Sequence, residues 1–307
     1  MYKKLSGDSS RQCLIPLVFF GADYSGRGRP LTLPQIRRYG WERDWPFEEI
    51  KEVLKRLDVP SVEGAYYWGD PRTRRIYSPV EVVRFWKVAR RRANLFRWIP
   101  FVKLVGVMNS LVHDNVSKES DIDFFVVAKQ GRMWLVRGLT LWLLTVLGWR
   151  AGKTKYLKVS PDLFLAEDGM DFSKADIPDD YLKAYWVADF MPIYQPQFFR
   201  KLWQANGWLK HKLPVAYRSP ILRPEMELRG GPVLLTRILE GVLGGKLGDR
   251  LEQRLKRKQL GIIDRNVKRF GQNPLVVVND HMVKIHFGDD KRTYLNAVVE
   301  EFLAEEF

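Results

Sequence analysis

The sequence predicts a protein of the mixed α+β class. Apolar residues with helical spacing dominate both ends of the chain, whereas the middle alternates strand-like apolar runs with a helix-like one. Strands are expected at 100–110, 121–127 and near 155–166, with a helix at 132–148 between the last two. This alternation indicates a small sheet that is flanked by helices.

The composition supports folded cores and a reducing compartment. The chain has 307 residues, of which 46% are hydrophobic and 13% aromatic, so two or three domains are expected. The single cysteine, Cys13, excludes intramolecular disulfides and cysteine-based zinc sites. The polar start at residues 1–12 lacks the apolar region of a signal peptide. We therefore expect a cytoplasmic protein.

The first part of the chain, residues 1–78, has a recognisable order of elements. Helices are predicted at 12–24, 31–41 and 46–58, and two short strands at 61–79 surround a Gly-Asp-Pro-Arg turn. Three helices followed by a hairpin resemble a winged-helix module. That resemblance implies either nucleic-acid contact through the second helix of a helix-turn-helix or packing against other protein, and both remain open.

The sequence predicts a core at residues 79–175 and a mostly helical region at 176–307. A long basic helix at 79–99 leads into the first strand of this core. The apolar run 133–149 is interrupted by Arg137 and is interpreted as a buried core helix rather than a short membrane span, so no membrane partner is expected. Later elements are helices at 179–190, 196–212, 232–247, 248–269 and 291–305, with a strand pair at 274–287.

The charge of the chain favours a polyanionic partner. Lys and Arg number 51 against 36 Asp and Glu, which gives a formal net charge of +15. Nucleic acid or nucleotide phosphates would match this charge, and a generically basic surface is the alternative. The aromatic-rich stretch 185–208 is interpreted as a helical core, with a base-stacking surface as the alternative.

Two aspartates stand one residue apart at the start of the second predicted strand. Asp121 and Asp123 would point to the same face of that strand, because strand side chains alternate. Like charges so close repel each other, so a divalent cation is the expected partner. Asn109 and Ser110 end the preceding apolar strand, and Ser120 directly precedes the acidic pair.

A turn serine that is followed by Asp-x-Asp on the next strand resembles the polymerase-β-like nucleotidyltransferases. The likeness covers residues 100–127 and implies Mg²⁺-dependent transfer of a nucleoside monophosphate from an NTP such as ATP to a hydroxyl acceptor. It implies that Asp121 and Asp123 ligate two Mg²⁺ ions, while Ser110 and the amides after it hold the triphosphate. Asn109 and Ser120 are also expected to contact the nucleotide. The family's glycine before Ser110 is Asn109 here, and Asn also tolerates a positive φ.

A third carboxylate is expected on a later strand in active members of this family. Asp162, which follows a proline in an apolar run, is the candidate for third metal ligand and general base. A structural strand-start residue is the alternative, with Glu167 and Asp168 as replacement acids. Lys155 is expected near the phosphates or in a solvated loop, and His113 near substrate or in a plain loop.

The sequence therefore predicts a magnesium-dependent nucleotidyltransferase. Its rival is a nucleic-acid-binding regulator, in which the basic helices bind DNA or RNA and a degenerate core only senses nucleotide. The acceptor, the preferred base and the oligomeric state remain open.

The basic run of the helix at 79–99 generates a test. If Arg90, Arg91 and Arg92 contact phosphates, replacing all three with Gln should flatten the salt dependence of nucleic-acid affinity. The slope should fall by about 0.9 per lost contact on B-DNA or about 0.7 on single strands, because each contact releases condensed counterions. Fluorescence anisotropy titrations across a salt series measure this slope. An unchanged slope would assign the run to a solvated helix face.

Overall fold

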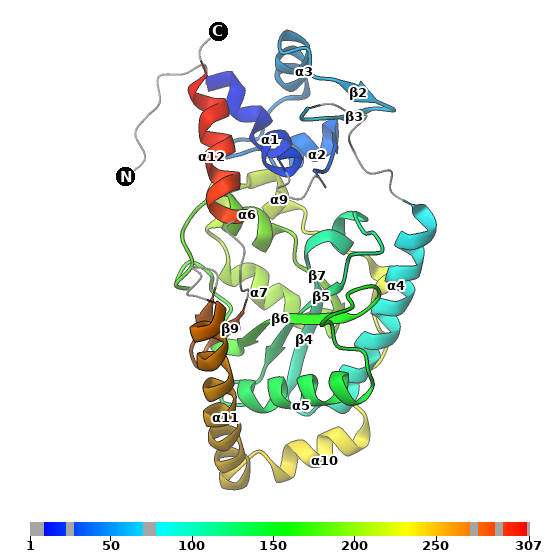
Figure 1. Cartoon of the computed structure of the whole chain (residues 1–307), viewed down its shortest axis with the longest axis vertical. Coiled ribbons are helices and arrows are strands. Elements are labelled where there is room, and N and C mark those ends of the chain that lie inside the picture. The colour runs from blue at the N-terminus through cyan, green and yellow to red at the C-terminus, as the bar shows by residue number, and fades with distance from the viewer. Residues whose placement is uncertain (1–8, 23–27, 70–77, 271–275, 286–290, 306–307) are drawn as a thin grey trace.

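A computed structural model of the chain describes residues 9–22, 28–69, 78–270, 276–285 and 291–305. The fold is mixed α/β, 54% helical and 14% strand, with a three-stranded and a six-stranded sheet (Figure 1). The class expected from the sequence is therefore confirmed. No helix in these ranges has both the length and the apolar character needed to cross a bilayer.

The N-terminal part is built from short helices and a small sheet. Its elements, in chain order, are η1 (Ser9–Leu14), α1 (Ile15–Gly21), β1 (Leu31–Thr32), α2 (Leu33–Arg38), α3 (Phe47–Arg56), β2 (Ser61–Val62) and β3 (Ala65–Tyr66). The hairpin was expected to turn at Gly-Asp-Pro-Arg, but β2 and β3 pair across Glu63-Gly64, where both residues have positive φ. The rest of that expected hairpin, residues 70–77, lies outside the described residues.

The large sheet has the strand order β7-β4-β5-β6-β9-β8. Its strands are β4 (Val102–Val107), β5 (Ile122–Ala128), β6 (Val159–Ala166), β7 (Met191–Tyr194), β8 (Val277–Val278) and β9 (Met282–Lys284). β4 runs antiparallel to β5, whereas β5 and β6 are parallel and are joined by α5 (Met133–Val146). The expected boundary at 175/176 therefore passes through one sheet, since β7, β8 and β9 come from the third region.

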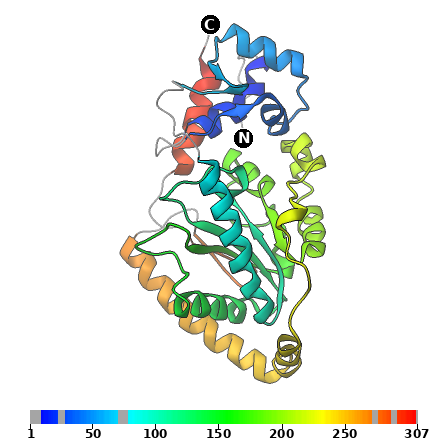
Figure 2. The same ribbon diagram turned by 90° about the vertical axis from the view of Figure 1, so that its right-hand side faces the viewer.

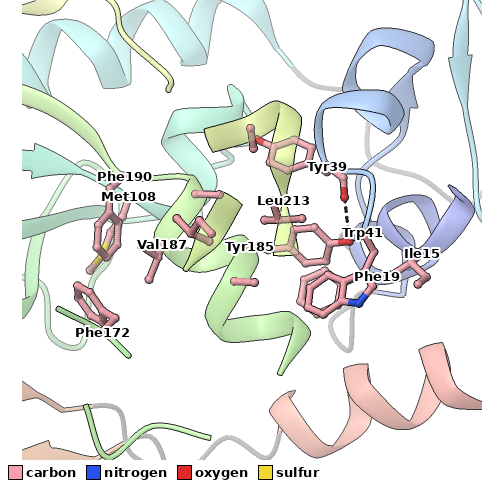
Figure 3. Close-up of a cluster of buried hydrophobic side chains, with 14 of the residues drawn as sticks. Ile15, Phe19, Tyr39, Trp41, Met108, Phe172, Tyr185, Val187, Phe190 and Leu213 are labelled. Atoms are coloured by element: carbon pink, nitrogen blue, oxygen red, sulfur yellow. Dashed lines mark hydrogen bonds between the residues drawn. The ribbon is translucent and has the colours of Figure 1, made fainter. Parts of the chain in front are cut away.

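Strand alternation divides the core between the two faces of this sheet. Phe125 and Val127 face a core shared with the N-terminal helices, and Phe124 and Val126 face the core beneath α4 (Pro79–Ala93) and α5. Figure 3 shows part of the first core, where Phe190 lies beside Met108 and Tyr185 reaches toward the N-terminal helices. The expectation that 133–149 forms a packed helix of this fold agrees with α5, whose buried side lies on β6 and α11.

The remaining helices surround the sheet and return to the N-terminus. They are α6 (Tyr181–Ala188), α7 (Phe199–Ala205), α8 (Leu209–Lys212), α9 (Pro214–Arg218), α10 (Leu234–Val242), α11 (Lys246–Phe270) and α12 (Lys291–Ala304), with the 3-10 turns η3 (Asn94–Trp98), η6 (Pro196–Phe198) and η7 (Pro224–Met226). α12 packs against α1, so the last helix completes the core of the first (Figure 1). The second view shows the N-terminal helices and α10 at opposite ends of the molecule (Figure 2).

β7 is an element that the sequence analysis did not predict. It occupies Met191–Tyr194, within the stretch interpreted as a helical core, and it pairs with β4 at the edge of the sheet. Pro192 would interrupt a helix, but an edge strand tolerates a proline because one of its sides needs no ladder hydrogen bond. β7 therefore fills the gap between the helices expected at 179–190 and 196–212, and it corrects the interpretation of 185–208 as wholly helical.

The basic run on α4 is only partly exposed. Arg90 and Arg91 are exposed, whereas Arg92 is half-buried and its guanidinium carbon lies 5.4 Å from the ring centroid of Trp149. Burial lowers the pKa of Arg92 below its usual range. Arg92 therefore has a packing role beside any contact with phosphate.

Gly106 on β4 allows a close approach that generates a stability prediction. A Cβ at this position would lie 2.1 Å from the ring of Phe125 and 2.5 Å from the carbonyl oxygen of Met191. Gly106→Ala should therefore lower the free energy of unfolding by about 1–3 kcal/mol, the usual cost of overpacking, as measured by urea denaturation. Gly152→Ala is the matched control, because no atom lies within 4 Å of its added Cβ. Equal effects of the two substitutions would contradict the packing argument.

Candidate active site

The topology brings three sequence-predicted segments to one edge of the large sheet. Val107, at the end of β4, pairs with Phe124 near the start of β5. Because β5 and β6 are parallel, the start of β6 lies at the same edge, where Ile122 is paired with Val159. The turn after β4, Asp121 just before β5, Asp123 within β5 and the acidic residue of β6 therefore share this edge, which we call the acidic edge.

A β-bulge places Asp162 at the acidic edge. The register between β5 and β6 shifts so that Phe124 pairs with Pro161 and Phe125 pairs with Leu163. Asp162 is the extra residue, and bulges of this kind re-aim a side chain beside functional sites. The Ser160 hydroxyl donates a hydrogen bond to its carboxylate. Asp162 is thus held by its own strand near the acidic pair.

Asp123 is the electrostatic centre of the acidic edge. Burial raises its pKa well above the usual value, and the negative charges of Asp162 and Asp121 raise it further. Its side chain also shares hydrogen bonds with Asp162 and with Asn109, and the Asn109 bond opposes the rise. Three carboxylates and Asn109 therefore act on one another at this edge.

The turn that carries Ser110 has a defined backbone. Asn109 adopts a left-handed conformation with φ of 61°, the conformation that Asn tolerates better than most residues. It begins the 3-10 turn η4 (Asn109–His113), and the amide of Asn115 donates to the carbonyl of Ser110 at 2.9 Å. Asn109 therefore supplies the positive φ that this turn requires.

Arg223 and Trp86, which the sequence analysis did not single out, hold this turn through Asp114. The Arg223 guanidinium makes a bidentate pair with Asp114, at 2.8 and 3.1 Å, and Trp86 Nε1 donates to the same carboxylate at 2.7 Å. Asp114 has a positive φ and ends η4. No local sequence signal connects positions 86, 114 and 223, because their contact depends on the tertiary fold.

Ser120 is buried, whereas Lys155 is exposed to solvent. The Ser120 hydroxyl is buried and accepts a hydrogen bond from the amide of Ser117 at 3.0 Å, so it braces the turn before Asp121. Lys155 is exposed in the loop before β6, and its carbonyl accepts from the amide of Lys158. Their expected contacts with nucleotide remain predictions.

The replacement acids lie away from the acidic edge. Glu167 and Asp168 belong to η5 (Glu167–Gly169), which follows the opposite, C-terminal end of β6. Asp168 accepts a hydrogen bond from Gln130 at 2.9 Å and pairs with His281 at 3.1 Å. The position of η5 therefore separates Glu167 and Asp168 from Asp121 and Asp123, and the contacts of Asp168 belong to a separate cluster.

Lys284 is a cation that the sequence analysis missed. It lies on β9 and pairs with Leu163, the residue that follows Asp162 on β6. Its ammonium is 4.8 Å from the ring centroid of Trp186. Burial lowers the pKa of Lys284 to about 8, and the charge of Asp162 opposes that fall. Lys284 therefore supplies positive charge beside the bulge.

His113 links the Ser110 turn to the N-terminal helices. Its Nε2 lies 2.5 Å from a carboxylate oxygen of Asp189, whose other oxygen accepts from the Tyr39 hydroxyl at 2.6 Å. Arg29 lies nearby, buried, with its guanidinium carbon 4.1 Å from the ring centroid of Phe20. His113 is therefore a half-buried member of a hydrogen-bonded network rather than a plain loop residue.

The charge states of this network follow from its burial. Burial lowers the pKa of His113, and the positive charge of Arg29 lowers it further, so the imidazole is neutral near pH 7 and Nε2–H donates to Asp189. Burial alone would raise the pKa of Asp189, but His113, Arg29 and the Tyr39 hydroxyl lower it below the usual range.

Within the described ranges, no group of three or more His, Cys, Asp or Glu side chains is assembled as a metal-holding cluster. The acidic edge therefore presents carboxylates whose charges interact without forming a complete ligand set.

Comparison of the chain with protein-family models, with curated proteins and with solved structures finds no match.

The lowered pKa of His113 predicts a loss of stability in mild acid. Below a pH of about 6.5 the unfolded imidazole takes up a proton while the buried one stays neutral, so stability falls as the pH falls toward the folded pKa. The slope has an upper limit of about 1.4 kcal/mol per pH unit for one proton. Urea denaturation of the wild type and of His113→Gln between pH 7.5 and 5.5 measures it.

His113→Gln keeps an N–H donor for Asp189 but has no proton to gain in this window. The variant should therefore show a flatter dependence on pH than the wild type. The same slope in both proteins would show that His113 does not carry this effect. Asp189 does not interfere, because its lowered pKa puts its titration below the window.

Proposed function

We propose that the chain is a nucleotidyltransferase that transfers a nucleoside monophosphate from an NTP to a hydroxyl acceptor. The observation that carries the proposal is the interaction of Asp121, Asp123 and Asp162 at one edge of the sheet, beside the turn of Asn109 and Ser110. An outward-facing Asp162 would have favoured the nucleotide-sensing rival, whereas an Asp162 whose charge raises the pKa of the buried Asp123 supports converging carboxylates and hence catalysis.

The donor set at the acidic edge suits Mg²⁺. A buried carboxylate between two others is destabilised until positive charge is added, and Mg²⁺ prefers carboxylate, phosphate and water oxygens. Because no complete protein ligand set is assembled, substrate oxygens and water would supply the rest of the coordination. When bound, Mg²⁺ would supply the charge that an in-line phosphoryl displacement requires.

The remaining roles belong to the chain's own residues. Ser110 and the amides after it would position the triphosphate, because unpaired N–H groups attract anions. Asp162, oriented by Ser160, would accept the proton of the acceptor hydroxyl. The hydroxyl oxygen then bonds to the α-phosphorus, the bond from that phosphorus to the bridging oxygen of the β-phosphate breaks, and pyrophosphate leaves with the electron pair.

The alternative function is a nucleic-acid-binding regulator with a degenerate core. Asn109 favours it, because its side chain bonds to Asp123 and stands where the family has a bare glycine. The N-terminal helices and the exposed Arg90 and Arg91 would then contact DNA or RNA. Incubation with each labelled NTP, Mg²⁺ and candidate acceptors separates the two functions, because only the enzyme labels an acceptor.

Substitutions at the acidic edge test the enzyme proposal. Asp121→Asn with Asp123→Asn should abolish transfer and leave the fold intact or stabilised, because removing neighbouring like charges relieves repulsion. Asp162→Asn should lower kcat by about 100-fold or more, the scale of general base catalysis, while the Kd of a non-hydrolysable NTP changes only a few-fold. Turnover assays, titration calorimetry and urea denaturation measure these effects.

The control is Asp264→Asn, which removes an exposed carboxylate from α11 by the same chemical change. It should leave turnover unchanged. Full activity of the Asp121/Asp123 double variant would refute the proposal. Turnover of Asp162→Asn within a few-fold of the wild type would assign Asp162 a structural role. A wild type that binds NTP without transfer to any acceptor would favour the regulator.

A further inference from the structure

The helix α10 packs against the molecule through its polar side. Thr236 is only 1% exposed, and its hydroxyl donates to the carbonyl of Arg97 at 2.8 Å. One turn later, Glu240 accepts from the amide of Phe101 at 2.6 Å. A surface helix normally turns its apolar side inward, so this arrangement is inverted.

The outward side of α10 is apolar. Leu234, Ile238 and Val242 follow one another at intervals of four and therefore share one face of the helix. Their exposed fractions are 74, 55 and 58%, and Leu235 beside them is 54% exposed. Contiguous exposed apolar side chains of this kind mark a surface that meets another apolar phase or partner.

Further apolar side chains lie next to this face. Trp98 is 54% exposed in η3, against which α10 packs, and Leu247 is 58% exposed at the start of α11. α10 and the start of α11 form the end of the molecule opposite the N-terminal helices in both views (Figures 1 and 2). The outer face of α10 is therefore accessible to an extended surface.

The charge around α10 is strongly positive. Residues 234–258 contain seven Lys and Arg and three acidic residues. Besides Glu240, the acids are Asp249, which pairs with Arg132 at 2.7 Å, and Glu252, which accepts from the amides of Trp134 and Leu135. All three acids are thus engaged by the protein.

Exposed cations continue from α10 along α11. They include Arg237, Lys246, Arg250, Arg254 and Arg257. Arg250, Arg254 and Arg257 follow the spacing of four and three that places residues on one helix face. Along the chain, the apolar face of α10 is therefore followed by exposed positive charge on α11 that no acid of this segment neutralises.

We propose that α10 is an interfacial helix that lies on an anionic lipid surface. Apolar side chains would enter the boundary between headgroups and acyl chains while the flanking Lys and Arg contact anionic headgroups, as is typical of such helices. A second copy of the chain would bring the same exposed positive charge, so like charges oppose a face-to-face pairing. The expectation of no membrane partner considered only a span at 133–149, and no helix in the described ranges could cross a membrane. The proposal goes beyond that expectation to a contact with the membrane surface, which needs no spanning helix.

Vesicle binding tests the proposal on the full chain. The wild type should co-sediment with vesicles of phosphatidylcholine and phosphatidylserine in about a three-to-one ratio, and less with phosphatidylcholine alone. The variant Leu234→Gln, Leu235→Gln, Ile238→Gln should bind at least about tenfold more weakly, because three apolar side chains that would enter the lipid are replaced by polar ones. The matched control is Val80→Gln with Val83→Gln on α4, whose valines are 65 and 67% exposed.

A second variant tests the role of the α11 arginines, and a second measurement tests whether the face binds another copy of the chain instead. Replacing Arg250, Arg254 and Arg257 with Gln should weaken binding to the anionic vesicles and leave binding to the neutral ones unchanged. No sedimentation of the wild type, or an equal loss in the α4 control, would overturn the proposal. A dimer that forms in analytical ultracentrifugation, and that the α10 variant abolishes while vesicle binding is absent, would assign the face to self-association instead.

Discussion

The carboxylate of Asp189 is the constraint that joins the parts of this molecule. It is buried between α6 and β7, and it accepts hydrogen bonds from His113 of the Ser110 turn and from Tyr39 after α2. Tyr185 of α6 in turn donates to the carbonyl of Tyr39 at 3.1 Å (Figure 3). Because an unpaired buried charge is costly, these segments must assemble together. The position of the candidate active site therefore depends on the N-terminal helices.

The acidic edge has the opposite effect on the stability of the protein. Asp123 is buried beside two like charges, and only the Asn109 side chain among the causes of its pKa shift favours its charged form. Such a cluster lowers the stability of the free protein, and a site of this kind persists when the surrounding sheet over-determines it. Here the pairing of β4, β5 and β6 and the bulge at Asp162 hold the carboxylates in place.

The sequence predicts the centre of the fold better than its connections. Local periodicity is strong in the apolar run of β5 and in the helix α5. The positions of these elements, and of the aspartates at the start of β5, therefore follow from the residue pattern alone. β7 and the pairing of Asp189 with His113 depend on contacts between distant residues, which periodicity does not encode. The bulge that aims Asp162 has no sequence signal beyond the neighbouring Pro161. The Arg223–Asp114 pair is likewise visible only in three dimensions.

The packing of α12 on α1 has a consequence for the ribosome-bound chain. Arg11 donates to the carbonyl of Phe302, a partner 291 residues away, and Phe302 belongs to the same buried core as the first helix. At translation rates of about 5–20 residues per second, the apolar side of α1 waits roughly 15–60 s for its partner. During that interval the nascent chain exposes the leucine, valine and phenylalanine side chains of α1. The core around α1 can therefore close only after α12 has been synthesised.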